Sequence, residues 1–180
     1  AALRSQHTPG RAQIVLALAN FYQGRAVVTP TNAEADAVNE ILLEALPGEA
    51  ALYLSRDEIL EATAEEKDHF PEEFLNDLDA SGMPPHRLQV KPGSMLILLR
   101  NVAADEGLCN GTRVVVTACR NHTLEVMILT ASHFGKDATL HRVCCDSSGD
   151  TDLPFVLRRR QFPMKLAWAM TINKAEGQTL

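Results

Sequence analysis

The segment Leu166 to Leu180, LAWAMTINKAEGQTL, constrains the fold more than any other part of the sequence. Lys165 to Met170 is an almost unbroken apolar run, which is typical of a parallel strand that is covered on both faces. Polar side chains follow directly where this strand should end, namely those of Thr171, Asn173 and Lys174. Open α/β sheets bind their ligands at that end of the strands. The segment therefore predicts a phosphate or nucleotide site, although an ordinary strand-to-helix connection would use the same residue types.

A second junction of this kind lies near the amino terminus. Arg25 to Thr29 is expected to be a buried strand, and Asn32 is expected to cap a helix that continues to about Leu46. The apolar side of that helix is expected to consist of Ala35, Val38, Ile41, Leu42 and Ala45. Free backbone N–H groups at the helix start, together with Thr31 and Asn32, can hold an oxyanion such as a phosphate. A simple N-cap is the alternative, and the two roles can coexist.

From Arg87 onward, the pattern changes to short strands separated by turns. We expect strands at Met95 to Leu99, Thr112 to Ala118 and Leu124 to Leu129, with a hairpin turn at Arg120 and Asn121. Asn110 and Gly111 are expected to form another turn, with Gly111 at positive φ. In the last strand, Leu124, Val126 and Ile128 fall on one face. This alternation indicates a small β-barrel.

The formal net charge of -6 is unevenly distributed along the chain. Asp57 to Asp79 contains ten acidic residues against Lys67, a local charge of -9, which leaves +3 for all the other residues. A mildly basic working surface is therefore allowed. We expect the acidic stretch to be an exposed, mobile excursion that avoids phosphates. Arg158, Arg159 and Arg160 form the densest basic cluster, which is expected to be a solvated loop, with phosphate contact as the alternative.

The four cysteines form no CxxC pair, and a reducing compartment fits this spacing better than a disulfide framework does. Cys119 with His122, and His141 with Cys144, could be imagined around zinc. Small thiols also pack well on strands, so we assign no metal site. The apolar run after Arg11 is too short to span a membrane, and no membrane partner is expected.

Several segments, in their order along the chain, resemble the Pif/RecD-like family of superfamily-one DNA helicases. They are RAVVTPTNAEADAVNEILL, LPGEAALYLSRDEI, MPPHRLQVKPGSMLILLRNVAADEGLCNGTRVVV, TDLPFVLRRRQFPMKLAWAM and, similar to the fifth helicase motif, AMTINKAEGQTL. The match extends from about Gly24 to Leu180. Ordered motifs are far more specific than any one of them alone.

The resemblance implies an α/β fold class: an incomplete RecA-like parallel-sheet motor domain with an inserted small Src-homology-type β-barrel. Residues 1–86 would be the first part of the second RecA-like domain, including the acidic loop 57–79. Residues 87–146 would be the inserted barrel, and residues 147–180 the return to the motor domain, truncated after the fifth motif.

The function that the resemblance implies is that of an ATP-dependent 5′-to-3′ DNA helicase, in DNA repair, recombination or telomere maintenance, or within a helicase-bearing transposon. The family uses ATP and Mg²⁺, moves on single-stranded DNA and pairs this domain with a first RecA-like domain. It works inside the cell, in the nucleus where the source is eukaryotic. A non-catalytic single-strand-binding or protein-interaction module with the same fold is the alternative.

Matching the motifs residue by residue gives the expected contacts. The implied DNA contacts are Thr31, Asn32, Thr171, Asn173 and Lys174. The implied nucleotide contacts are Glu176, Gly177 and Gln178. Family members commonly carry a small hydroxyl residue and a Gln where this chain has Ala175 and Glu176, so a carboxylate replaces an amide near the expected phosphates. Repulsion there would weaken binding unless Glu176 turns outward.

The 180 residues contain no GxxxxGK[ST] loop and no catalytic residue that we can assign. The magnesium carboxylate and the final arginine of the family are also expected to lie outside them. We therefore predict that the purified 180-residue chain shows no ATP hydrolysis above a buffer blank, with or without DNA. A phosphate-release assay checks this. DNA-stimulated turnover that persists through successive purification steps would contradict the assignment.

Overall fold

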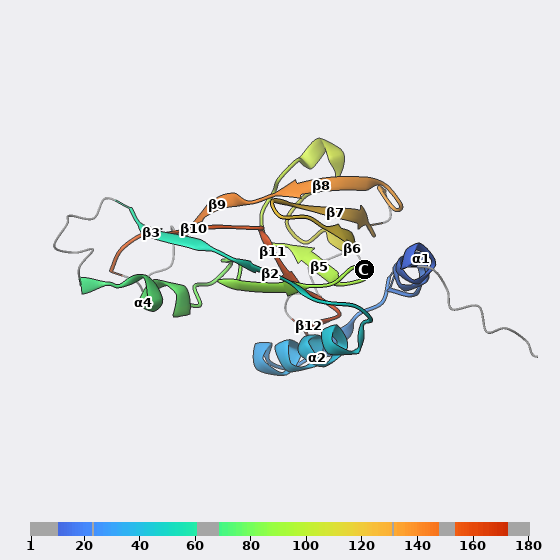
Figure 1. The fold of residues 1–180 in the computed structure, drawn as a ribbon, viewed down its shortest axis with the longest axis horizontal. Coiled ribbons are helices and arrows are strands. Elements are labelled where there is room, and N and C mark those ends of the chain that lie inside the picture. Colours follow the sequence, from blue (N-terminus) through green and yellow to red (C-terminus); the bar gives the residue numbers. More distant parts are fainter. Residues whose placement is uncertain (1–10, 23, 61–68, 131, 148–153, 173–180) are drawn as a thin grey trace, which may run out of the picture.

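The computed structural model describes residues 11–22, 24–60, 69–130, 132–147 and 154–172 (Figure 1). The helices and strands are α1 (Arg11–Tyr22), β1 (Val27–Thr29), α2 (Asn32–Ala45), β2 (Ala51–Leu54), β3 (Arg56–Ile59), α4 (Glu72–Asp77), β4 (Arg87–Val90), β5 (Met95–Leu98), the 3-10 turn η1 (Ala104–Glu106), β6 (Arg113–Cys119), β7 (Thr123–Ile128), β8 (Asp137–His141), β9 (Val143–Asp146), β10 (Leu157–Gln161), β11 (Met164–Leu166) and β12 (Ala169–Thr171). Within these ranges no helix is both long enough and apolar enough to cross a membrane.

An antiparallel sheet of order β11-β5-β6-β7-β8 forms the largest part of the molecule. The separate pair β2-β4 contributes Tyr53, Leu88 and Val90 to the same core as the sheet. The expected alternation in β7 is confirmed, because Leu124, Val126 and Ile128 are buried there. The two expected turns are also present. The N–H of Arg120 donates to the carbonyl of Thr123 across 3.0 Å, and Gly111 has a φ of 88°.

The apolar run at Lys165 to Met170 forms two strands, where the sequence predicted one. β11 pairs antiparallel with β5 in the large sheet, whereas β12 pairs parallel with β1. The change takes place within two residues. The N–H of Ala167 donates to Met95 of β5 (2.9 Å), and the carbonyl of Trp168 accepts from Val27 of β1 (2.9 Å). One extended segment thus pairs first with β5 and then with β1, and passes from one sheet to the other.

The strand and helix near the amino terminus are less buried than predicted. Val27 and Val28 of β1 are 42% and 49% exposed, because within the described residues β1 pairs only with β12. Along α2 the inward stripe is Ala35, Asn39 and Leu43, spaced by four residues. Ile41 is 64% exposed, so the expected apolar face was placed partly on the wrong side. A polar residue in the true stripe explains the error.

A three-stranded sheet, of order β3-β10-β9, corrects two further predictions (Figure 1). Asp57, at the start of the acidic stretch, lies in β3 and is buried, and Leu75 of α4 is buried against Ile59 and Leu157. The start and end of that stretch are therefore built into the fold, while residues 61–68 lie outside the described residues. Arg158, Arg159 and Arg160 are part of β10 and not of a loop.

Arg159 is the most highly connected side chain of this sheet. It is 2% exposed, and its guanidinium donates to both carboxylate oxygens of Asp57 at 2.7 to 3.1 Å. It also donates to the backbone carbonyls of Leu75, Asn76, Leu78 and Pro84 at 2.9 to 3.2 Å. Three of these carbonyls lie at the end of α4, where the last carbonyls of a helix lack the usual N–H partner four residues further along. The guanidinium thus joins β3, β10 and α4.

Arg159→Gln should lower the free energy of unfolding by about 3–5 kcal/mol, because it leaves the buried Asp57 carboxylate without its counter-charge. Arg160→Gln is the matched control, since Arg160 is exposed on the same strand. Its effect should stay within about 0.5 kcal/mol. Urea unfolding of both variants measures the difference. Similar losses of unfolding free energy for the two variants would show that the buried ion pair contributes no more to stability than an exposed arginine.

Candidate nucleic-acid site at the parallel strand ends

The parallel pair β1-β12 brings the two predicted junctions together. Thr29 and Thr171 are paired residues at the carboxyl ends of these strands. The hydroxyl of Thr29, which is buried, lies 3.1 Å from the carbonyl of Thr31 and 3.4 Å from that of Met170. α2 begins directly after β1 and packs on both strands. The helix start and the end of β12 therefore share one edge of the molecule.

Thr31 is the N-cap of α2, so the prediction that Asn32 caps the helix is wrong. The Thr31 hydroxyl accepts from the N–H of Glu34 (3.3 Å), and the Glu34 carboxylate accepts from the N–H of Thr31 (3.2 Å). This is a capping box, which satisfies two of the first four N–H groups of the helix. Thr31 has the extended backbone of an N-cap, whereas Asn32 is already helical. The Glu three residues after Thr31 was the sequence signal for this cap.

The capping box changes the electrostatics of the expected phosphate site. The Glu34 carboxylate occupies the positive end of the helix dipole, where an incoming phosphate would otherwise have been favoured. The backbone amides of Asn32 and Ala33 are the remaining first-turn donors. The side chain of Asn32 is exposed and is not needed for the cap. Asn32 is thus better placed than Thr31 to meet a ligand at this edge.

Asn39 fixes the position of β12 and was not predicted. It is 2% exposed on α2, and its side-chain amide donates to the carbonyls of Leu166 (3.3 Å) and Ala169 (3.1 Å). Its side-chain oxygen accepts from the N–H of Ala169 (2.8 Å). These groups border the two residues at which the chain changes sheets, where strand pairing leaves polar backbone atoms unmatched. A polar residue within an otherwise apolar helix stripe was the signal available in the sequence.

Arg113 is a second buried residue that sequence reasoning missed. It lies in β6, and its guanidinium donates to the carbonyl of Tyr22 at the end of α1 (3.2 Å) and lies 3.5 Å from that of Ala167. Burial lowers the pKa of the Arg113 guanidinium. Its position at the carboxyl end of α1 partly offsets that desolvation, because a helix dipole favours a positive charge there. Arg113 links α1 to the segment that leads into β12.

The other predicted site residues stand as follows. Asn173, Lys174, Ala175, Glu176, Gly177 and Gln178 lie outside the described residues. The roles of Thr31, Asn32 and Thr171 as DNA contacts stay predictions. Each of the four cysteines is a thiol outside any disulfide, and the described part of the chain contains no cluster of three or more His, Cys, Asp or Glu side chains that could hold a metal.

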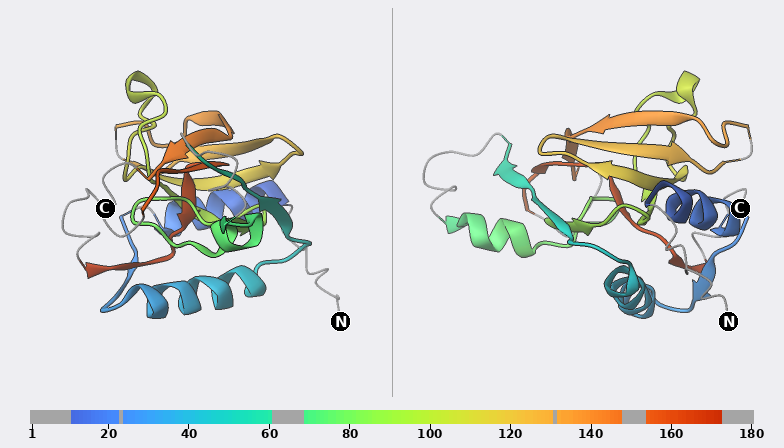
Figure 2. Two further views of the ribbon diagram at one scale, coloured as in Figure 1. Left: turned by 90° about the vertical axis from the view of Figure 1, so that its left-hand side faces the viewer. Right: turned by 45° about the vertical axis from the view of Figure 1, so that its right-hand side comes forward.

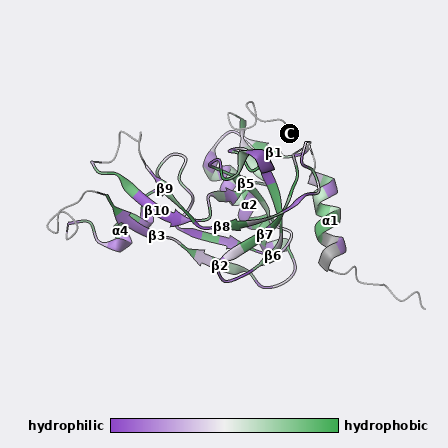
Figure 3. Cartoon of the chain, turned by 90° about the horizontal axis from the view of Figure 1, so that it is seen from above, coloured by the Kyte–Doolittle hydropathy of each residue, from purple (hydrophilic) through white to green (hydrophobic). Residues whose placement is uncertain are grey.

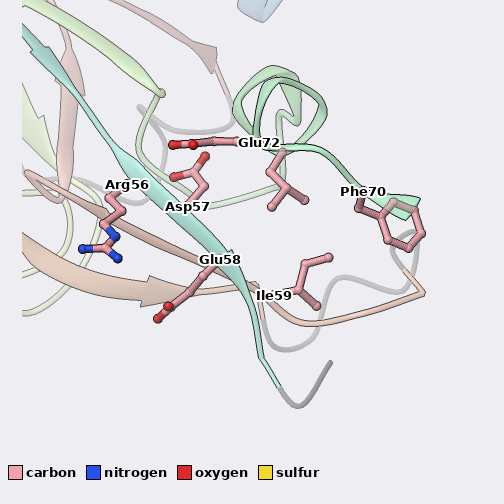
Figure 4. A pocket seen from close by; sticks show the side chains of 7 residues that line it. Arg56, Asp57, Glu58, Ile59, Phe70 and Glu72 are labelled. Atoms are coloured by element: carbon pink, nitrogen blue, oxygen red, sulfur yellow. The ribbon is translucent and has the colours of Figure 1, made fainter. Parts of the chain in front are cut away.

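A separate cavity of about 280 Å³ lies between β3 and α4 (Figure 4). Its lining is Arg56, Asp57, Glu58, Ile59, Phe70, Glu72 and Leu75. Asp57 and Glu72 point toward each other on the α4 side of β3, whereas Arg56 and Glu58 point to the other side (Figure 4). Two carboxylates facing the cavity make it unsuited to a phosphate. Asp57 is also already bound by Arg159. The strand ends of β1 and β12 therefore remain the candidate site.

Comparisons with known proteins agree with this fold. Residues 73–119 match the family described as DNA helicase Pif1, 2B domain. The chain is 30% identical over 180 residues to the human ATP-dependent DNA helicase PIF1, covering 98% of this chain and 24% of that protein. The chain thus spans about a quarter of the length of that relative.

Solved structures are similar at lower identity. The Pif1 helicase of Candida albicans has a TM-score of 0.60 at 19% identity, covering all of this chain and 48% of that one. A Bacteroides Pif1 in complex with ADP-AlF3 and single-stranded DNA has a TM-score of 0.55 at 18% identity, covering 97% of this chain and 42% of that one. The resemblance and the predicted fold class, a RecA-like domain with a small inserted barrel, are confirmed.

Thr31→Ala should lower the free energy of unfolding by about 1 kcal/mol, because the capping box loses its hydroxyl. Asn32→Ala should change it by less than about 0.5 kcal/mol, since the exposed Asn32 side chain makes no cap bond. Thermal and urea unfolding of the two variants test the assignment of the cap. A larger loss for Asn32→Ala would restore the role that the sequence suggested for Asn32.

Proposed function

Because this chain is Pif1-like in both sequence and fold, we propose that it is the second RecA-like motor domain, with its inserted barrel, of an ATP-dependent 5′-to-3′ DNA helicase. The observation that carries the proposal is the pairing of Thr29 with Thr171. This pairing puts the start of α2 and the end of β12 at one edge, which is the ligand-binding edge of parallel sheets.

The residues at this edge suit the backbone of a single DNA strand. The exposed Asn32 side chain and the half-buried Thr171 offer short neutral donors, and the first turn of α2 adds backbone amides. Lys174, three residues after Thr171 in the sequence, adds a positive charge. Such groups contact phosphate and sugar, and so they hold a strand without reading its bases. A motor that moves along DNA requires such sequence-independent binding.

The proposal extends to the nucleotide. ATP with Mg²⁺ would bind between this domain and a first RecA-like domain, with Glu176, Gly177 and Gln178 on this side of the cleft. Closing and opening of that cleft would move the two domains along the strand. The protein would act inside the cell, in the nucleus where the source is eukaryotic, in DNA repair, recombination or telomere maintenance, or within a transposon.

The test is the affinity for single-stranded DNA, measured by fluorescence anisotropy across a salt series. Lys174→Ala should weaken binding similarly for unrelated sequences and make the salt dependence shallower by about 0.7 in log–log slope, since one fewer counterion is released. Asn32→Ala and Thr171→Ala should weaken binding with little change in slope, because each removes a neutral contact.

Two exposed residues of the barrel hairpins serve as matched controls. Lys136→Ala removes the same charge as Lys174→Ala, and Asn121→Ala removes the same amide as Asn32→Ala. Neither should alter affinity or slope. If Lys174→Ala and Asn32→Ala both bind DNA as the unaltered chain does, the strand-end site is not part of the DNA path.

A further inference from the structure

The open face of the β3-β10-β9 sheet carries a second group of charges. Along β3, Arg56 and Glu58 point to the side of the strand opposite Asp57 and Glu72 (Figure 4). Residues that are paired across neighbouring strands lie on the same face of a sheet, so the partners of Arg56 and Glu58 in β10 and β9 share their face. Arg160 pairs with Arg56 and with Cys144, and Arg158 pairs with Glu58 and with Asp146. α4 packs on the other face, through Leu75 and Ile59.

One of the three arginines on this face is already neutralised. Arg158 donates to both carboxylate oxygens of Asp146 at 2.7 and 2.8 Å, and Glu58 lies opposite it on β3. The hydrogen bonds to Asp146 raise the pKa of Arg158, and the same bonds lower the pKa of Asp146. The two carboxylates of this face are thus gathered around Arg158. They lie two positions along the strands from the other arginines.

Arg56 and Arg160 lack such partners. They are exposed and directly opposite each other across two antiparallel strands, and within the described residues neither makes an ion pair. Like charges at directly opposite positions destabilise a sheet. Among the described residues, the fold therefore places two exposed arginines at directly opposed positions of the sheet without an acidic partner. An anion that bridges them would remove that repulsion.

We propose that Arg56 and Arg160 form a binding site for the phosphate backbone of DNA. Guanidinium groups match phosphate oxygens in pairs, and two of them on one face can hold one or two neighbouring phosphates. The acidic residues of α4 do not oppose this, because α4 covers the other face of the sheet. Cys144, exposed beside Arg160 on β9, marks the edge of the site.

This site is distinct from the strand ends of β1 and β12. The β3-β10-β9 sheet lies at one end of the long axis of the molecule, away from β12 and α2 in Figure 1 and away from β1 in Figure 3. The inference rests on the proposed function. It adds a second grip, on a segment of the DNA other than the strand held at the parallel pair.

The test compares the unaltered chain with Arg56→Gln, Arg160→Gln and the double variant, using a duplex that carries a single-stranded tail. The double variant should bind roughly tenfold more weakly at low salt. Its log–log salt slope should be shallower by about 1.4 to 1.8, because two phosphate contacts are lost. Lys136→Gln, which removes one charge from an exposed turn, should bind as the unaltered chain does.

The melting temperature of the same samples is measured to check folding. The proposal predicts that it does not fall with the loss of DNA binding. Removing one of two opposed charges should leave the melting temperature unchanged or raise it, while DNA binding falls. A fall in both would indicate a structural role and would overturn the proposal. So would an affinity and slope of the double variant equal to those of the unaltered chain, or a loss of the same size for Lys136→Gln.

Alkylation of Cys144 gives a local readout. DNA should slow its reaction in the unaltered chain and not in the double variant, with the buried Cys145 as an internal reference. A poly-glutamate peptide replaces DNA in a parallel experiment. Arginine-dependent binding of that peptide, with DNA binding unaffected, would assign the face to an acidic protein and overturn the proposal.

The same data separate this inference from the proposed function. If the unaltered chain binds no DNA, the proposed function fails together with this site. If DNA binding depends on Lys174 and Asn32 but not on the two arginines, the proposed function stands and this site alone is rejected.

Discussion

The buried ion pair of Asp57 and Arg159 is the interaction on which one end of the molecule depends. A guanidinium without water needs a counter-charge and acceptors for its remaining N–H groups, and here Asp57 and four backbone carbonyls supply both. The carbonyls come from the end of α4 and from Pro84, so one side chain joins the start of the acidic stretch, in β3, to its end, at α4. Ser55 strengthens the arrangement, because its hydroxyl lies 2.6 Å from the Asp57 carboxylate and 2.8 Å from a ring nitrogen of His86.

The period of two along β10 divides its three consecutive arginines between two tasks. Arg159 faces inward and organises the fold, so its neighbours Arg158 and Arg160 must face outward. The same alternation in β3 sends Asp57 inward and Arg56 outward. Two segments that look like plain charge runs in the sequence thus become a neutral buried pair and an open charged face. The net charge of the chain does not describe either of them, because each depends on which face of the sheet a residue takes.

The sequence predicted well what depends on local patterns and poorly what depends on tertiary pairing. The strands and turns of the barrel follow from alternation and turn residues, and β5, β6 and β7 lie within a residue or two of their predicted bounds. Asn39 was visible as a polar residue in an apolar helix stripe, but its partners, and the burial of Arg113, could not be predicted, because a polar residue is buried only when distant carbonyls are positioned to meet it. The charge run that includes Asp57 was misjudged for the same reason. At the candidate site the two junctions were found from the sequence, while their alignment at Thr29 and Thr171 required the pairing of β1 with β12.

The passage from β11 to β12 connects the large antiparallel sheet directly to the candidate site at the parallel pair. The carbonyl of Met95 in β5 accepts from the N–H of Ala167, and the carbonyl of the next residue, Trp168, accepts from the N–H of Val27 in β1. The Trp168 ring is buried among residues of α1, α2, β5 and β6. Asn39 of α2 and Arg113 of β6 both bond to backbone carbonyls of this short segment. Between β11 and β12 the chain contains only Ala167 and Trp168, and both are buried. If DNA binds at the strand ends as proposed, packed side chains rather than a flexible linker connect that site to the large sheet.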